Sequence, residues 1–184
     1  MSTGLVPGGP DPDDEDRRRR RVLWAMPTGL YLIGSRARVD GAVRRNLMTA
    51  SLVMQVATDP KLVAVAVDAA AVTAALVSAG GGFTVSLLER TDRAVVRRFV
   101  KPVTDTVTDS EGRAASMAGQ AVTEAPSGAP VLGAAPAWLD CALRQRLELG
   151  SHVLFIGEVT ALAGPDGDLP PVLRMEDTKM SYGG

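Results

Sequence analysis

The sequence predicts a mainly β protein, in which a β-barrel carries a few short helices. Apolar residues occupy alternate positions over 139–149 except at Gln145, and most residues between them are charged. A period of two is that of a half-buried antiparallel strand. Gly150 and Ser151 then form a tight turn, so residues 152–163 return as the partner strand. The other segments read as strands and two short helices without β-α-β alternation, which favours a barrel over a parallel sheet.

Further strands precede this hairpin, and residues that favour turns separate them. The first strand leads to a hairpin turn around Asp40 and Gly41, a residue pair typical of such turns. Asp59 and Pro60 then divide two apolar runs rich in β-branched residues. These strands are predicted over residues 28–34, 52–56, 62–67 and 83–88.

Two short helices lie between the strands. Thr73 is a candidate N-cap for a helix over 74–79, which the glycines 80–82 end. Because these glycines follow a helix and precede a strand, they lack the strand–glycine–helix order of a dinucleotide-binding loop. Thr91 and Asp92 are expected to cap a second helix that runs to about residue 101.

Two segments lack the pattern of core elements. Residues 102–136 are rich in Ala, Gly, Pro, Ser and Thr, and we expect them to form a long excursion over the surface. Residues 1–20 are predicted to be a disordered, charged arm, which leaves 21–184 as one domain. The basic run 17–21 precedes an apolar run, as in an export signal. That apolar run is shorter than the roughly 20 residues of a membrane span, so no membrane segment is expected.

Composition excludes several function classes. The net charge is −1 and only 4% of the residues are aromatic, so neither nucleic-acid binding nor attraction to an anionic membrane is expected. Cys141 is the only cysteine, which precludes an intrachain disulfide and favours a cytoplasmic location. One cysteine and one histidine cannot supply the four ligands of a structural zinc site, and no metal site is predicted.

Asn46 and His152, the only asparagine and the only histidine, are the candidate functional residues. Asn46, Thr49 and Ser51 read as small polar residues on a loop between strands. They either satisfy backbone groups of a turn or contact a polar, planar ligand. His152 follows the late hairpin turn, and is either a partly exposed polar residue or a ligand donor near neutral pH.

Six segments, taken in order, resemble the flavin reductase family with the FMN-binding split-barrel fold. Residues 46–51 (NLMTAS) resemble the family's N-x-M-T-x-S flavin loop, and 150–159 (GSHVLFIGEV) resemble its G-D-H-x-L-F-I-G-E-V run. The other four segments are 26–31 (MPTGLY), 59–63 (DPKLV), 82–88 (GFTVSLL) and 137–141 (AWLDC). The resemblance covers about residues 24–182 and implies a Greek-key split β-barrel.

The resemblance also implies a function. The protein would be a homodimer that binds FMN, or FAD, and reduces it with NADH or NADPH, and it would supply reduced flavin to a partner monooxygenase. His152 would be the catalytic residue on the nicotinamide side. Residues 46–51 would follow the isoalloxazine edge, Thr73 and 86–88 would approach the ribityl phosphate, and Tyr182 would lie at the pocket mouth. The full set of implied flavin contacts is Asn46, Leu47, Met48, Thr49, Ala50, Ser51, Asp68, Thr73, Ser86, Leu87, Leu88 and Tyr182.

The chain departs from the family pattern on the phosphate side. Residues 70–73 read AAVT where the family often has Ser-Ser-x-Thr, and Ser86 replaces an asparagine. Fewer hydroxyl and amide donors suggest a flavin that is held loosely, as a substrate. Two alternatives remain open on sequence alone. One is a flavin- or haem-binding carrier or sensor without catalysis, and the other is a small β-barrel interaction domain without a cofactor.

Overall fold

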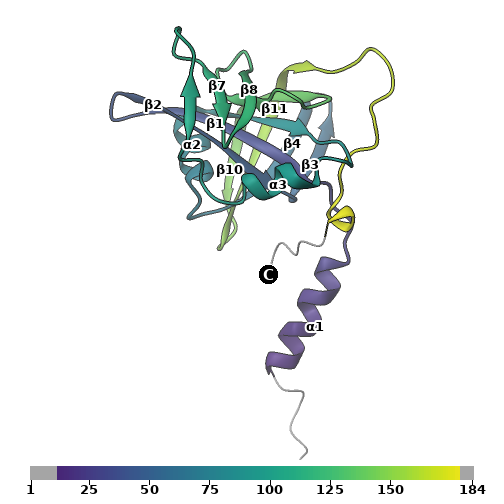
Figure 1. Ribbon diagram of the computed structural model, residues 1–184. Coiled ribbons are helices and arrows are strands. Elements are labelled where there is room, and N and C mark those ends of the chain that lie inside the picture. Colours follow the sequence, from purple (N-terminus) through teal and green to yellow (C-terminus); the bar gives the residue numbers. More distant parts are fainter. Residues whose placement is uncertain (1–11, 179–184) are drawn as a thin grey trace, which may run out of the picture.

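The computed structural model describes residues 12–178, and its centre is a seven-stranded antiparallel sheet. The strand order β2-β1-β5-β10-β11-β4-β3 does not follow the chain, because strands distant in sequence pair with each other. Figure 1 shows these strands wrapped around a common interior. The strands are β1 Tyr31–Val39, β2 Ala42–Ala50, β3 Val53–Thr58, β4 Lys61–Asp68, β5 Gly82–Leu87, β10 Trp138–Glu148 and β11 His152–Ala163.

The sheet curls into a barrel that stays open at one seam. β2 and β3 are its two edge strands, yet only Ser51 and Leu52 separate them in the chain. A linker of this length reaches about 10 Å at most, so the two edges must lie close together. The sheet therefore curves almost to closure, which confirms the predicted split barrel.

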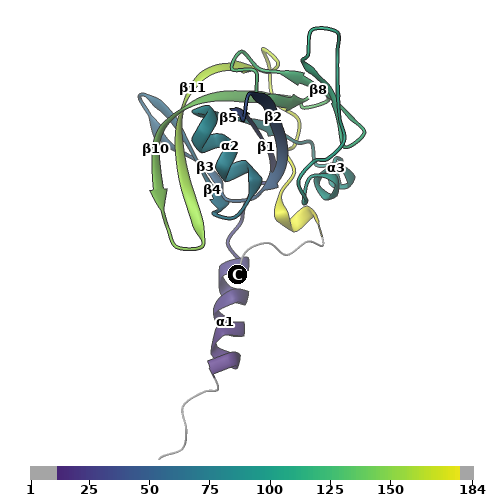
Figure 2. The ribbon, with the colours of Figure 1, turned by 90° about the vertical axis from the view of Figure 1, so that its left-hand side faces the viewer.

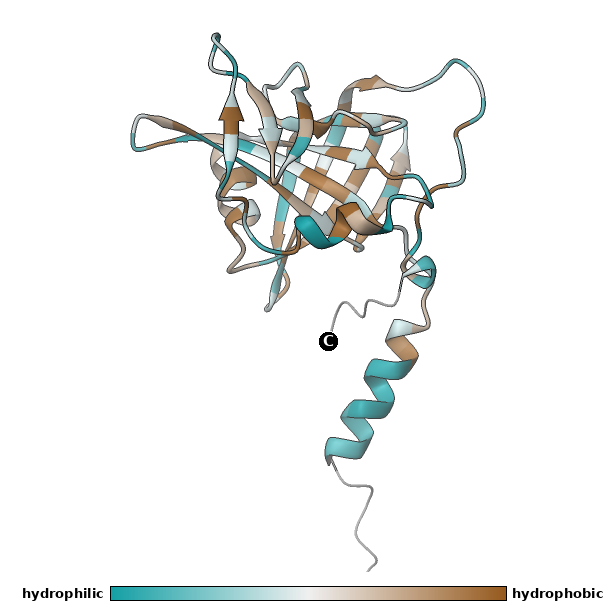
Figure 3. Ribbon diagram, in the orientation of Figure 1, coloured by the Kyte–Doolittle hydropathy of each residue, from teal (hydrophilic) through white to brown (hydrophobic). Residues whose placement is uncertain are grey.

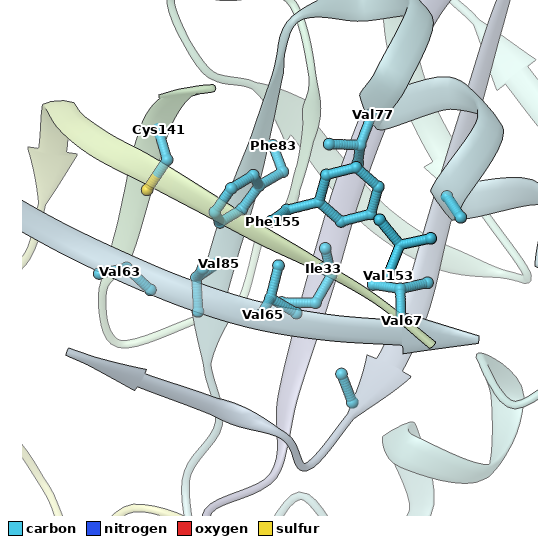
Figure 4. Close-up of a cluster of buried hydrophobic side chains, with 12 residues drawn as sticks. Ile33, Val63, Val65, Val67, Val77, Phe83, Val85, Cys141, Val153 and Phe155 are labelled. Carbon is cyan, nitrogen blue, oxygen red and sulfur yellow. The ribbon is translucent and has the colours of Figure 1, made fainter. Parts of the chain in front are cut away.

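A short helix, α2 (Val72–Gly80), lies across one mouth of the barrel, as Figure 2 shows. Gly81 ends it in the left-handed conformation (φ 74°), which confirms the prediction of a glycine C-cap. Ala71 is the N-cap, so the expectation that Thr73 caps this helix is wrong, and Thr73 instead lies buried in its first turn. Between helix and sheet lies a core of Val and Phe side chains, drawn in Figure 4, which includes Phe83 and Phe155.

A second core lies on the other side of β1 and β2. A small antiparallel sheet and helix α3 (Arg93–Arg98) pack there, and Val96, Phe99 and Met117 are fully buried. The expectation that residues 102–136 form a surface excursion is therefore wrong. The strands in this segment are only three to five residues long, too short for the sequence to show a period. The four strands are β6 Thr106–Thr108, β7 Ala114–Met117, β8 Gln120–Glu124 and β9 Pro130–Leu132.

The first hairpin places the Asn46 segment in a strand. Asp40 and Gly41 both have positive φ (50° and 78°), which confirms the predicted turn between β1 and β2. β2 continues through Ala50, so the prediction of a loop from residue 46 is wrong except at Ser51. β1 begins at Tyr31, later than the predicted start at residue 28, and continues to Val39.

The late hairpin forms where the sequence predicts it, between β10 and β11. Register shifts follow Asp140 and Leu143, and they interrupt the regular alternation of inward and outward side chains. As a result, Cys141 is buried but Leu147 is 41% exposed, so the predicted half-buried face holds only for the first half of β10.

The N-terminal arm is a helix in the described part. α1 (Pro12–Trp24) projects from the barrel in Figures 1 and 2, where a disordered arm over residues 1–20 was expected, and residues 1–11 lie outside the described part. Ion pairs such as Arg19–Glu15 and Arg20–Asp16 join successive turns of α1. The helix is polar along most of its length and apolar at its end, as Figure 3 shows.

None of the described helices is long and apolar enough to cross a membrane. The chain's last described element is a 3₁₀ turn, η1 (Met175–Asp177).

Candidate functional site

An open cleft of about 540 Å³ lies at the seam of the barrel, where the chain crosses from β2 to β3. Its walls come from the end of β2, the end of β4, the start of β11, the segment before α2 and the segment after α3. Most of the lining is apolar, and four polar residues, Thr49, Ser51, Asp68 and His152, contribute to it. The lining residues are Met48, Thr49, Ala50, Ser51, Leu52, Ala66, Val67, Asp68, Ala70, Ala71, Val100 and His152.

Two of these polar residues, His152 and Asp68, lie on neighbouring strands. His152 opens β11 directly opposite Asp68, the last residue of β4. A hydrogen bond joins His152 Nδ1 to the hydroxyl of Ser151 at 2.9 Å and orients the ring. Asp68 Oδ1 accepts a hydrogen bond from the backbone N–H of Ala70 at 2.8 Å, which shapes the turn that leads into α2.

The start of α2 faces the cleft through Ala70 and Ala71. No side chain caps this end of the helix, because Ala71 occupies the N-cap position. A helix N-terminus carries unpaired N–H groups and a partial positive charge, so it favours an anionic group placed against it. The cleft therefore combines an apolar floor, a few polar residues and an end suited to an anion.

Asn46 lies behind the wall of the cleft rather than in its lining. Its side chain is 3% exposed, and both ends of its carboxamide are bonded inside the protein. Nδ2 donates to Thr73 Oγ1 at 2.9 Å, and Oδ1 accepts from the N–H of Val103 at 3.0 Å. Thr49 is similarly occupied, since its hydroxyl donates to the carbonyl of Val96 at 2.7 Å.

The predicted site residues thus fall into separate groups. The cleft brings together Met48, Thr49, Ala50, Ser51, Asp68 and His152. Leu47 and Leu88 are fully buried in the second core, and Ser86 accepts a hydrogen bond from the N–H of Leu132 at 3.1 Å, so these side chains serve the barrel. Leu87 lines a different groove, and Tyr182 lies outside the described residues.

Sequence reasoning missed six lining residues, namely Leu52, Ala66, Val67, Ala70, Ala71 and Val100. Leu52 adjoins the predicted flavin segment and could have been found by extending it. Ala70 and Ala71 were noticed only as lost hydroxyls, although it is their position at a helix start that matters. No sequence motif points to Val100 as a cleft residue, because only the packing of the segment after α3 brings it there.

A second groove, of about 330 Å³, is lined by the starts of β1 and β4 and the ends of β5 and β11, so it lies at the other ends of β4 and β11 from the first cleft. Its lining is mostly apolar and includes Tyr31, Val53, Met54, Leu87 and Leu162. Burial raises the pKa of Tyr31 above its usual value of 10.0, so this phenol stays neutral. No group of three or more His, Cys, Asp or Glu side chains that could hold a metal ion occurs among residues 12–178.

Known proteins resemble the chain in sequence and in fold. It is 32% identical over 160 residues to an NADH-dependent FAD reductase from Streptomyces globisporus, covering 86% of this chain and 82% of that protein. It is 28% identical to the stachydrine N-demethylase reductase subunit Stc3 from Rhizobium meliloti (strain 1021), covering 80% of this chain and only 58% of that longer protein.

Solved structures give the same result. The styrene monooxygenase flavin reductase from Pseudomonas putida S12 superposes with a TM-score of 0.64 at 26% identity, covering 85% of this chain and 90% of that one. The profile of the family described as "Flavin reductase like domain" matches residues 23–183, which include every strand of the barrel and the whole cleft. The chain belongs to the family of flavin reductase like domains.

Proposed function

We propose that this protein is an NADH- or NADPH-dependent flavin reductase, an oxidoreductase of the EC 1.5.1 type that reduces FMN or FAD. The observation that carries the proposal is the cleft at the barrel seam, which joins an apolar floor to an uncapped helix N-terminus. A flavin has the matching shape, a planar ring system at one end and a phosphate at the other. The family membership and the NADH-dependent FAD reductase among its relatives support this assignment.

The residues of the cleft fit each part of a flavin. The ring would lie against Met48, Ala50 and Leu52, whose side chains line the floor. The hydroxyl of Ser51 bonds to no other described residue, so it is available to a carbonyl or nitrogen of the ring edge. The phosphate would lie at the N–H groups that open α2, where the helix dipole favours negative charge.

A bound flavin would supply the chemistry here, as the acceptor of a hydride from the nicotinamide. The chain's task is to hold the two rings stacked and to exclude water from between them. Leu52, Val67 and Val100 provide apolar walls for that purpose. His152, held by Ser151, would orient the nicotinamide, and Asp68 would keep the turn before α2 in place. No nucleophile or metal ligand is required.

We further propose that the flavin is a diffusible substrate. Ala70 and Ala71 offer no side-chain hydroxyl at the phosphate end, and the cleft is open to solvent. Each missing hydrogen bond to a charged group would lower the binding free energy by roughly 1.5–3 kcal/mol. Weak binding would allow reduced flavin to leave the cleft for a partner monooxygenase. The similar fold of a protein named as the flavin reductase of a styrene monooxygenase supports this proposal.

Two features support proposals about assembly and location. β3 ends the sheet order, and Met54 and Val56 on it are 65% and 46% exposed, so this edge is suited to bury apolar surface in a homodimer. The lone, buried thiol of Cys141 supports a reducing compartment such as the cytoplasm.

Anaerobic single-turnover mixing tests the function. Protein, FMN or FAD, and an equal amount of NADH or NADPH are combined without oxygen, and the visible flavin absorbance is followed. We expect this absorbance to bleach far faster than in the mixture without protein. A yellow, flavin-binding protein that never speeds bleaching with either nucleotide would instead be a carrier, and a protein that binds neither flavin would contradict the site itself.

A further inference from the structure

The carboxamide of Asn46 connects three walls of the cleft. Asn46 belongs to β2, on the same face as Met48, which lines the cleft two residues further on. Its Nδ2 bonds Thr73 in the first turn of α2, and its Oδ1 bonds the N–H of Val103 beyond α3. These partners lie 27 and 57 positions away in sequence, so one side chain joins β2 to two segments that are distant from it in the chain.

Each bonded partner is close to a lining residue. Thr73 lies two residues after Ala71, and Val103 lies three residues after Val100. Ala71 and Val100 line the cleft from different segments, one before α2 and the other after α3. The two hydrogen bonds of the Asn46 amide therefore tie both segments to β2.

Burial makes these two bonds consequential. Asn46 is 3% exposed and Thr73 is 0% exposed, so neither group can exchange its partner for water without the walls moving. A buried donor that loses its partner forces local rearrangement, and a positioned ring stack tolerates little displacement.

We infer that Asn46 is a positioning residue for the flavin, which holds the lining segments around Ala71 and Val100 in place through Thr73 and Val103 and does not itself touch the ligand. The inference rests on the proposed function, since it concerns flavin binding in the same cleft. It also gives a physical reason why this chain retains its single asparagine at this position.

A matched control lies directly across the sheet. Ser35 on β1 pairs with Asn46 in the strand register, so the two side chains share one face. Ser35 is fully buried and its hydroxyl has no hydrogen-bond partner among the described residues. Ser35→Ala thus removes a buried polar group at the same place without breaking any connection between the walls.

The test compares Asn46→Ala, Thr73→Val, their double variant, Thr73→Ser and Ser35→Ala. Flavin Kd is measured by fluorescence quenching, and the KM for flavin and kcat by NADH oxidation. We expect Thr73→Val to raise Kd and KM by about tenfold, the weight of one buried hydrogen bond, and Asn46→Ala, which breaks two bonds, to raise them by at least as much, with kcat nearly unchanged in both. Thr73→Ser and Ser35→Ala should stay within about twofold of wild type.

The double variant separates positioning from direct contact. If both residues act through one hydrogen bond, the double variant binds flavin no more weakly than the weaker single variant. If each contacts flavin independently, the effects multiply to about a hundredfold, and the inference is wrong. Thr73→Val carries the test by itself if Asn46→Ala fails to fold, because it preserves side-chain shape.

Amide hydrogen exchange gives a readout that needs no activity. Exchange at the N–H of Val103 should speed up in Asn46→Ala and remain slow in Ser35→Ala. Unchanged exchange at Val103, or folded variants with unchanged flavin Kd, would overturn the inference alone. Wild-type protein that binds neither FMN nor FAD would overturn the proposed function and this inference together.

Discussion

At the scale of single residues, Cys141 shows how burial sets chemistry. Its side chain is 1% exposed inside the core of the barrel. Burial, and then the neighbouring charge of Asp140, raise its pKa from the usual 9.0 to about 12. The thiol is therefore protonated and unreactive in the folded protein, and it takes no part in the proposed chemistry.

This shift predicts a loss of stability in alkaline solution. Between pH 9 and about 12 the unfolded thiol ionises while the folded thiol stays protonated, so the unfolded state binds fewer protons. The stabilising effect is complete below pH 9 and is lost as pH rises toward 12. Urea unfolding across this range should show a steeper decline for wild type than for Cys141→Ala. Tyr31, whose pKa is also raised, is present in both proteins. Parallel declines would contradict the prediction.

Local sequence reasoning could find residues near the cleft but could not assign their side-chain roles. Small polar residues such as Asn46 and Thr49 usually bond to their own turn, which is why a loop was predicted. In the structure their partners are Thr73 and Val96, 27 and 47 positions away. Only the tertiary fold brings such partners together. His152 was easier, because it directly follows the predicted turn at Gly150, whereas Asp68 entered only through the family resemblance.

At the scale of elements, β2 is joined to the small sheet by a largely buried ion pair. Arg45 Nε lies 2.6 Å from Glu124 Oε1, and the two side chains are 9% and 12% exposed. Glu124 Oε1 also accepts from the N–H of Ala114 at 2.9 Å, and Arg45 donates to the carbonyl of Gly112 at 3.1 Å. The sequence did not predict this pair, because Arg45 and Glu124 lie on strands that are far apart in the chain.

Removing one charge of this pair should destabilise the fold. We expect Glu124→Gln to lower the free energy of unfolding by about 3 kcal/mol, because Arg45 then remains buried without a counter-charge. The double variant Arg45→Met with Glu124→Leu should lose less. Glu148→Gln, which breaks the exposed pair with Arg146, should change stability by less than about 1 kcal/mol. Urea denaturation measures all three, and equal small losses for Glu124 and Glu148 would contradict the burial argument.

At the scale of the whole molecule, barrel closure was the part that sequence predicted best. The period of two in 139–149 and the turn at Gly150 locate the β10–β11 hairpin, and the ordered motifs indicate the split barrel. The strand order was not predictable in the same way, because β5 pairs with both β1 and β10 across long stretches of chain. The place of the cleft follows from that order, since it lies where the two edge strands meet.

The same order leaves β3 open to a second copy of the chain. Its outer edge pairs with no other described strand, and Met54 is 65% exposed. If the proposed homodimer forms there, Met54→Lys should shift the protein from dimer to monomer in analytical ultracentrifugation. Leu23→Lys on α1, which is similarly exposed at 60%, serves as the control and should leave the dimer intact. A dimer that survives Met54→Lys would place the interface elsewhere.

The proposed hydride transfer is tested most directly by aerobic turnover with free flavin. A catalytic amount of purified protein is mixed with excess NADH or NADPH and with FMN or FAD, and loss of the reduced nicotinamide absorbance is recorded. The account predicts consumption that rises in proportion to protein and saturates with flavin, because the flavin enters and leaves the cleft as a substrate. Consumption no faster than in the flavin mixture without protein, with both nucleotides and both flavins, would contradict it.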